Sequence, residues 1–214
     1  MVRREESSIR EALISVLSPQ LIRRRATKLR AVKRARKVDI VALVYTLVLG
    51  FDHGAKRTVA SLRRAYAMST ETTLAPSAFY DRFTPALAEL MRELTMHAFE
   101  RLSRGNTKLH GALSAFAKVA IADGSIIRLH DALRPDYPSV WTNHTKAGAK
   151  LHAVIDGATR TPTCGRIVPG SRHDLPLLSV GAEHRGTLFV FDLAYDQGKL
   201  FQRILDARAT LSAA

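Results

Sequence analysis

One stretch decides how the second half of the chain folds: FAKVAIADGSIIRL, residues 116–129. Residues 116–122 are apolar except for Lys118, and a run of this kind predicts a buried strand. Asp123 and Gly124 interrupt the run, and a β-rich pattern resumes over residues 125–129. An aspartate at the end of a buried strand is costly unless it binds something. Asp123 is therefore a candidate functional residue.

The chain after this stretch alternates strand and helix patterns. The further predicted strands span residues 150–155, 163–168 and 187–193, and Asp156-Gly157 is typical of a hairpin turn between the first two. The predicted helices span residues 175–180, with Asp174 as the N-cap, and 197–207. The predicted order is β-β-β-α-β-α, with the first three strands antiparallel.

A second aspartate, Asp192, lies at the end of the strand predicted over residues 187–193. Two carboxylates on neighbouring strands can hold hard divalent cations, because Mg²⁺ takes one or two carboxylates and fills its other positions with water and phosphate oxygens. Two such ions about 4 Å apart can activate an attacking oxygen and stabilise a leaving one in phosphodiester chemistry. The alternative is that N–H groups of the following turns satisfy both acids. The residues alone leave both interpretations open.

The first half of the chain predicts helices and no strands, because its apolar residues recur every three or four positions. Ser18 and Thr84 are predicted helix caps, each followed by a proline at the first helical position. Residues 38–49 are apolar nearly all round, which predicts the central helix of a domain. We therefore predict an α+β protein with a basic helical domain over residues 1–108 and an α/β domain over residues 109–214.

Positive charge is concentrated in the first half. The chain holds 33 Lys and Arg against 19 Asp and Glu, a formal net charge of +14, and residues 1–110 hold 21 of these cations and 10 of these acids. A surplus of this size predicts a polyanionic partner, with nucleic acid favoured over an anionic membrane. Residues 22–37 hold nine cations and no acid, so this segment is expected either to grip DNA phosphates or to form a solvated helix face. The predicted DNA contacts there are Arg23, Arg24, Arg25, Lys28, Arg30, Lys33 and Arg34. In the second half, Lys150 and His173 are expected to contact DNA or to orient a carboxylate.

Several classes of protein are excluded by the composition. With 46% hydrophobic and 24% charged residues, the chain has the composition of a globular protein. A single cysteine, Cys164, excludes a disulfide framework and favours the reducing cytoplasm. The longest apolar run, residues 38–51, is interrupted by Asp39 and is shorter than the roughly 20 residues that a membrane helix needs, so no membrane partner is expected.

Several motifs resemble those of a known family. The order of strands and helices, with one aspartate in the first strand and another after the fourth, is similar to the ribonuclease H-like fold. The motif around the first acid, and those that follow it in order, resemble the DDE transposases of the insertion-sequence-four type found in bacteria and archaea. The stretches that carry this resemblance are SAFYDRF (77–83), IADGSIIRLH (121–130), AGAKLH (147–152), RHD (172–174), FDLAY (191–195) and LFQRI (200–204).

The resemblance implies a function and a set of site residues. It implies that Asp123 and Asp192 are the first two catalytic, metal-binding carboxylates, with Mg²⁺ or Mn²⁺ as the cofactor. It implies cleavage at the ends of an insertion sequence and strand transfer into target DNA, with terminal inverted repeats bound by the N-terminal domain and a homodimer as a further expectation. The family's third acid is a Glu in a Tyr-Arg-Glu-Lys signature on a later helix, and this sequence holds no such signature.

The missing signature leads to further expectations. We expect a C-terminally incomplete ribonuclease H-like domain that lacks its fifth strand and is inactive alone. Glu183 and Asp206 do not lie in the context of the third acid. The alternatives are a non-catalytic DNA-binding remnant or repressor of the full transposase, and a ribonuclease H-like nuclease. Whether the chain is itself an enzyme is left open by its sequence.

Overall fold

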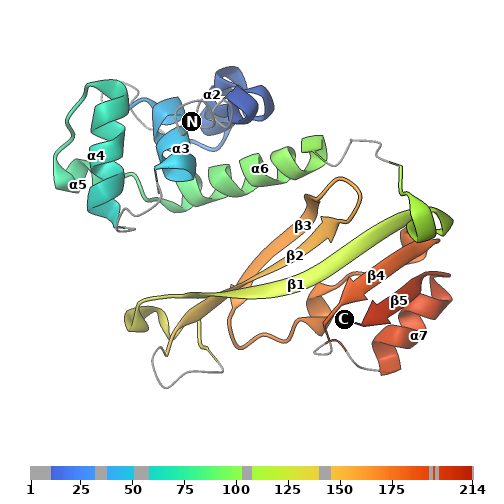
Figure 1. The fold of residues 1–214 in the computed structure, drawn as a ribbon. Helices are drawn as coiled ribbons and strands as arrows, with labels where there is room; N and C mark the ends of the chain where they lie inside the picture. The colour runs from blue at the N-terminus through green and yellow to red at the C-terminus, as the bar shows by residue number, and fades with distance from the viewer. Residues whose placement is uncertain are drawn as a thin grey trace. The chain divides into compact units, whose positions relative to one another are not determined.

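The computed structural model describes residues 11–31, 38–50, 58–102, 108–139, 146–192, 195 and 198–213. The chain divides into two compact units, Met1–Ala98 and Phe99–Ala214, each with its own hydrophobic core (Figure 1). The predicted domain boundary at residues 108–109 directly follows residues 103–107, which lie outside the described part of the chain, and it stays a prediction.

Unit 1 is helical in its described residues. Its helices are α2 (Pro19–Lys28), α3 (Ile40–Leu49), α4 (Val59–Thr70), α5 (Pro76–Tyr80) and α6 (Pro85–Leu102), the last of which runs past the division between the units. Two helices begin at the predicted caps. The Ser18 hydroxyl accepts a hydrogen bond from the N–H of Leu21 at 3.3 Å, and the Thr84 hydroxyl accepts one from the N–H of Leu87 at 3.2 Å.

Helix α3 lies at the centre of unit 1, as its apolar sequence predicts. Asp39 caps it, with Oδ1 accepting hydrogen bonds from two N–H groups of the first turn, and Gly50 ends it. The backbone N–H of Asp39 also donates to the buried hydroxyl of Tyr66 on α4, at 2.9 Å. The core around α3 draws on every helix of the unit, and its fully buried members include Ile22, Leu43, Val44, Tyr66, Phe79, Leu90 and Leu94.

Unit 2 is built on a five-stranded mixed sheet (Figure 1). Its strands are β1 (Lys118–Arg128), β2 (Gly148–Asp156), β3 (Thr161–Pro169), β4 (Thr187–Phe191) and β5 (Thr210–Ala213), in the spatial order β3-β2-β1-β4-β5. β1, β2 and β3 pair antiparallel, β4 is parallel to β1, and β5 is parallel to β4. Helix α7 (Gly198–Asp206) connects β4 to β5. Helices followed by such a sheet confirm the α+β prediction and are consistent with a partial ribonuclease H-like domain.

Two sequence expectations about the strands are wrong. A fifth strand was expected to be missing, but β5 pairs with β4 from Leu188↔Thr210 to Phe191↔Ala213. Its four residues, TLSA, are too short a run for their alternation to predict a strand, and the strand is defined by its backbone pairing. Asp123 was expected to end a strand, but β1 continues to Arg128 because β2 pairs with it along residues 120–128.

One face of the sheet packs against α7 and the loop before β4. Ala120 and Ala122 of β1 and Phe189 and Phe191 of β4 are buried there, together with Leu200 and Ile204 of α7. The hairpin between β2 and β3 forms as predicted, because Asp156 Oδ1 accepts hydrogen bonds from the N–H groups of residues 158 and 159. Among the residues that the structure describes, no helix is long and apolar enough to cross a membrane.

Candidate metal centre and nucleic-acid surface

The two predicted catalytic acids follow the last residue pair between β1 and β4. Ala122 of β1 pairs with Phe191 of β4, Asp123 is the next residue of β1, and Asp192 directly follows the end of β4. Residues at matching positions of neighbouring parallel strands point to the same face, and such strands lie about 4.8 Å apart. Both acids are exposed. The register therefore places the two acids next to each other, at the C-terminal end of β4.

The backbone at Asp123 is closely packed on its other side. The Asp123 Oδ1 accepts a hydrogen bond from the N–H of Gly124 at 2.7 Å. Side chains alternate along a strand, so Gly124 belongs to the face of Ala122, opposite to the side chain of Asp123. A Cβ atom on Gly124 would lie 2.6 Å from Oδ1 of Asp174, which reaches this face from the loop after β3. Glycine is therefore the residue that leaves room for the Asp174 carboxylate.

Lys150 of β2 holds this carboxylate. Its ammonium donates to Oδ2 of Asp174 at 2.8 Å and to the backbone carbonyl of Arg172 at 2.7 Å. The two side chains are only 11% and 19% exposed. Asp174 was predicted to cap a helix over residues 175–180, but only the short 3₁₀ helix Leu175–Leu177 forms and Asp174 makes no side-chain cap, because its carboxylate binds Lys150 instead.

Two further polar side chains are buried next to this ion pair. His152 lies opposite Gly124 in the β1–β2 register and is fully buried, and its ring is 6.2 Å from that of Tyr195. Both ring nitrogens of His152, the hydroxyl of Tyr195 and Oδ1 of Asp174 have no hydrogen-bond partner among the described residues. Four unpaired buried polar atoms in one small region are unusual, since most such atoms in folded proteins are paired.

The pKa shifts of these two side chains show which charges surround them. Burial lowers the pKa of His152, and the Asp174 carboxylate is the charge that opposes this most. Burial also raises the pKa of Tyr195 far above its usual range, and the negative charges of Asp174, Asp123 and Asp192 raise it further, in that order. Both side chains are therefore held neutral, and three carboxylates act on the Tyr195 hydroxyl.

The donor chemistry of the acid pair suits a hard divalent cation. Carboxylate oxygens are the ligands that Mg²⁺ and Mn²⁺ prefer, and Mg²⁺ is often held by one or two of them. The described residues contain no group of three or more His, Cys, Asp or Glu side chains that could hold a metal ion. Asp174 in particular approaches the strand from the face opposite to Asp123, so it is not placed as a ligand beside the acid pair.

The predicted DNA contacts of the first half differ in their surroundings. Arg23, Arg24, Lys28 and Arg30 are exposed on or just after α2. Arg25 is only 25% exposed, and its guanidinium donates to the carboxylate and the backbone carbonyl of Glu93 on α6, at 3.2 and 2.9 Å. Lys33 and Arg34 lie outside the described residues.

The two predicted DNA contacts of the second half also differ. His173 is exposed in the loop after β3, whereas Lys150 is buried in its ion pair with Asp174. Of the two roles expected for Lys150, orienting a carboxylate agrees with its contacts. DNA contact by either residue stays a prediction.

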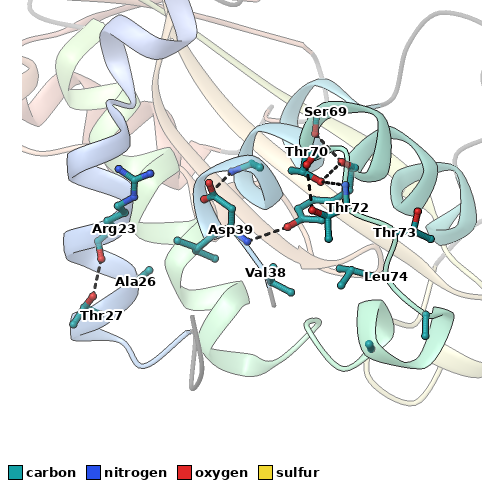
Figure 2. A pocket seen from close by; sticks show the side chains of 15 residues that line it. Arg23, Ala26, Thr27, Val38, Asp39, Ser69, Thr70, Thr72, Thr73 and Leu74 are labelled. Atoms are coloured by element: carbon teal, nitrogen blue, oxygen red, sulfur yellow. Dashed lines mark hydrogen bonds between the residues drawn. The ribbon is translucent and has the colours of Figure 1, made fainter. Parts of the chain in front are cut away.

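A hollow of about 1040 Å³ opens beside α2 in unit 1. Figure 2 shows Arg23 and Thr27 of α2 on one side of it and the hydroxyl residues Ser69, Thr70, Thr72 and Thr73 on the other. Val38 also lines the hollow. The six residues before it in the sequence, 32–37, carry four cations and lie outside the described residues. Exposed hydroxyl and guanidinium groups of this kind are typical phosphate contacts.

Sequence reasoning missed three residues near the acid pair: Asp174 as a buried carboxylate, His152 and Tyr195. All three lie within the motifs that carry the family resemblance, which was the available signal. Their mutual contacts depend on the β1–β2 register and on the path of the loop after β3, neither of which the sequence displays.

A comparison with known families gives one match, which lies in the second unit. Residues 114–212, slightly under half of the chain, match the family model described as Transposase DDE domain. The matched residues include β1 to β4, all but the last residue of β5, and both candidate acids. The match supports a transposase function and implies DNA as the partner, and DDE transposase domains generally use divalent metal ions. No curated protein matches the chain.

Proposed function

We propose that this protein is a transposase of an insertion sequence, which cleaves phosphodiester bonds at the element's ends and transfers the strands to target DNA. The observation that carries the proposal is the register: Asp123 and Asp192 directly follow the last pair of two parallel strands, inside the segment that matches a transposase DDE domain. The resemblance to the insertion-sequence-four type adds the substrate, namely DNA with terminal inverted repeats. A DNA substrate and a single cysteine fit a cytoplasmic location.

In this proposal, Asp123 and Asp192 hold Mg²⁺ or Mn²⁺. When bound, such ions activate an attacking oxygen and stabilise a leaving one. The chain's own contribution is to fix the two carboxylates: Asp123 through its hydrogen bond to the N–H of Gly124, and both acids through the pairing of β1 with β4. We further propose that a third carboxylate, which the residues of this sequence do not supply, completes the site. This chain is then not expected to cleave DNA without it.

We assign DNA binding to the exposed cations on α2 and just after it. Arg23, Arg24, Lys28 and Arg30 are exposed, so their charges can neutralise phosphates without first leaving a partner inside the protein. Inverted repeats present two equivalent DNA sites, which two symmetric copies of the chain can occupy. We therefore propose a homodimer on the paired ends.

Two measurements test this function. Binding of the purified chain to a duplex is expected to weaken steeply with salt, because each neutralised phosphate releases counterions. In a nicking assay with Mn²⁺, the chain alone is expected to leave inverted-repeat DNA intact. A chain extended to include a third acid is expected to cleave it, and Asp123→Asn in that extended chain should abolish cleavage.

The alternative function, a non-catalytic DNA-binding repressor, predicts a different result. It predicts the same salt-dependent binding but no cleavage with any extension and no loss of function in Asp123→Asn. The absence of DNA binding at low salt would contradict both functions.

A further inference from the structure

We propose that Asp174 is a positioning residue for the acid pair: held by Lys150, it supports the backbone of β1 at Gly124 from the face opposite to Asp123. The proposal rests on the proposed function, because the site that it positions is the metal-binding pair Asp123 and Asp192. Asp174 acts through the backbone and is not itself placed as a ligand.

The first step is the position of the carboxylate. Oδ1 of Asp174 lies where a Cβ of residue 124 would meet it at 2.6 Å, so the carboxylate packs directly against the strand at Gly124. Gly124 is bonded to Asp123 by both the peptide link and the hydrogen bond from its N–H to Oδ1 at 2.7 Å. A shift of the strand at Gly124 therefore moves the Asp123 carboxylate.

The second step is what holds Asp174 in place. Oδ2 binds the Lys150 ammonium at 2.8 Å, and the same ammonium binds the carbonyl of Arg172 at 2.7 Å. Lys150 thus fixes both the carboxylate and the loop that carries it. Lys150 and Asp174 are 11% and 19% exposed, so little water competes for the pair.

The third step is the set of unpaired polar atoms around the pair. Asp174 Oδ1, the Tyr195 hydroxyl and both nitrogens of His152 are buried without partners among the described residues. Groups that hold and orient metal ligands from the second layer are commonly polar, and their loss typically weakens metal binding by 10- to 100-fold. A purely structural ion pair gives no reason for its neighbours to stay polar and unpaired, since apolar side chains would pack there at less cost.

Metal binding by the full chain tests the proposal. Mn²⁺ affinity is measured by titration calorimetry for the unmodified chain and for Asp174→Asn, Gly124→Ala and Lys150→Arg. We expect Asp174→Asn and Gly124→Ala to weaken Mn²⁺ binding about tenfold. Lys150→Arg keeps the charge and the donors, so its affinity should stay within about twofold of the unmodified chain. The matched control is Lys118→Met. It removes a cation of β1 that pairs with Asp156 at 3.8 Å and is 42% exposed, and it should leave the Mn²⁺ affinity unchanged.

The outcomes separate this proposal from the proposed function. If Asp174→Asn binds Mn²⁺ as tightly as the unmodified chain, the positioning role is wrong, and the proposed function is unaffected. If the unmodified chain and Asp123→Asn both fail to bind Mn²⁺, the metal site itself is wrong.

The positioning role is then decided without metal, by the unfolding free energies of Gly124→Ala, Asp174→Ala and the double variant. We expect the cost of Gly124→Ala to nearly vanish once Asp174 is alanine, because the contact at 2.6 Å is gone. Additive costs would overturn the proposal.

Discussion

Replacing Lys150 with methionine isolates the energy of the buried ion pair. Methionine keeps the length of the side chain but leaves the Asp174 carboxylate without its cation. Removing one partner of a buried pair typically costs 3–5 kcal/mol, because the remaining charge is left uncompensated. The exposed fractions of 11% and 19% place this pair at the lower end, at about 3 kcal/mol. Such a loss changes the unfolding equilibrium roughly a hundredfold.

Urea unfolding followed by hydrogen exchange of β1 and β2 peptides measures this cost in unit 2 alone. With a slope of about 2 kcal/mol per M, the midpoint for Lys150→Met is expected to fall by about 1.5 M. The control Lys118→Met breaks a pair that is longer, at 3.8 Å, and more exposed, so its cost should stay below about 1 kcal/mol. A Lys150→Met midpoint equal to that of the unmodified chain would contradict this prediction, because it would mean that Lys150 does not neutralise Asp174 in solution.

Three other predictions follow from the contacts. Arg23→Ala is expected to lower DNA affinity and its salt dependence, measured by anisotropy titration, without changing the urea midpoint. Arg25→Ala should instead destabilise unit 1 by about 1 kcal/mol in urea unfolding, because it removes the half-buried pair with Glu93. Burial lowers the pKa of His152, so the folded state favours the neutral ring, and the stabilisation is full above pH 6.5 and falls as the pH drops below it. His152→Phe should therefore reduce the dependence of the urea midpoint on pH between about pH 6.5 and 5. Tyr195→Phe removes a buried hydroxyl without a described partner, so it should raise the unfolding free energy by up to about 1 kcal/mol. Burial raises the pKa of this phenol, so its ionisation on unfolding lowers stability above about pH 10, and the variant should lose that effect. An unchanged pH dependence of the urea midpoint above about pH 10 would contradict this.

Several parts of the fold were predictable because their signals are local. Ser18-Pro19 and Thr84-Pro85 mark helix starts, since a capping hydroxyl and a proline with fixed φ act within one turn of backbone. The apolar run that forms α3 and the Asp156-Gly157 turn are likewise read within a few residues. The two acids were found because a charge that follows an apolar strand is rare enough to need an explanation.

Other parts depended on partners far along the chain. β5 has only four residues, too few for a pattern to predict it, and its pairing with β4 makes it a strand. Arg23 and Arg25 are two residues apart in one basic run, yet Arg25 binds Glu93 of α6 and Arg23 is exposed. The difference depends on the position of Glu93, which lies 68 residues further along the chain.

The components of the site can be read from the chain: two acids that follow apolar runs, the motifs around them and the surplus of positive charge before them. Their arrangement depends on contacts between distant segments. The register set Asp123 beside Asp192, and the loop after β3 carried Asp174 over Gly124 to meet Lys150. An ion pair is strengthened where packing excludes water, and Lys150 and Asp174 are buried together although they lie 24 positions apart in the chain. Their burial depends on the elements that pack around them and not on their neighbours in the sequence.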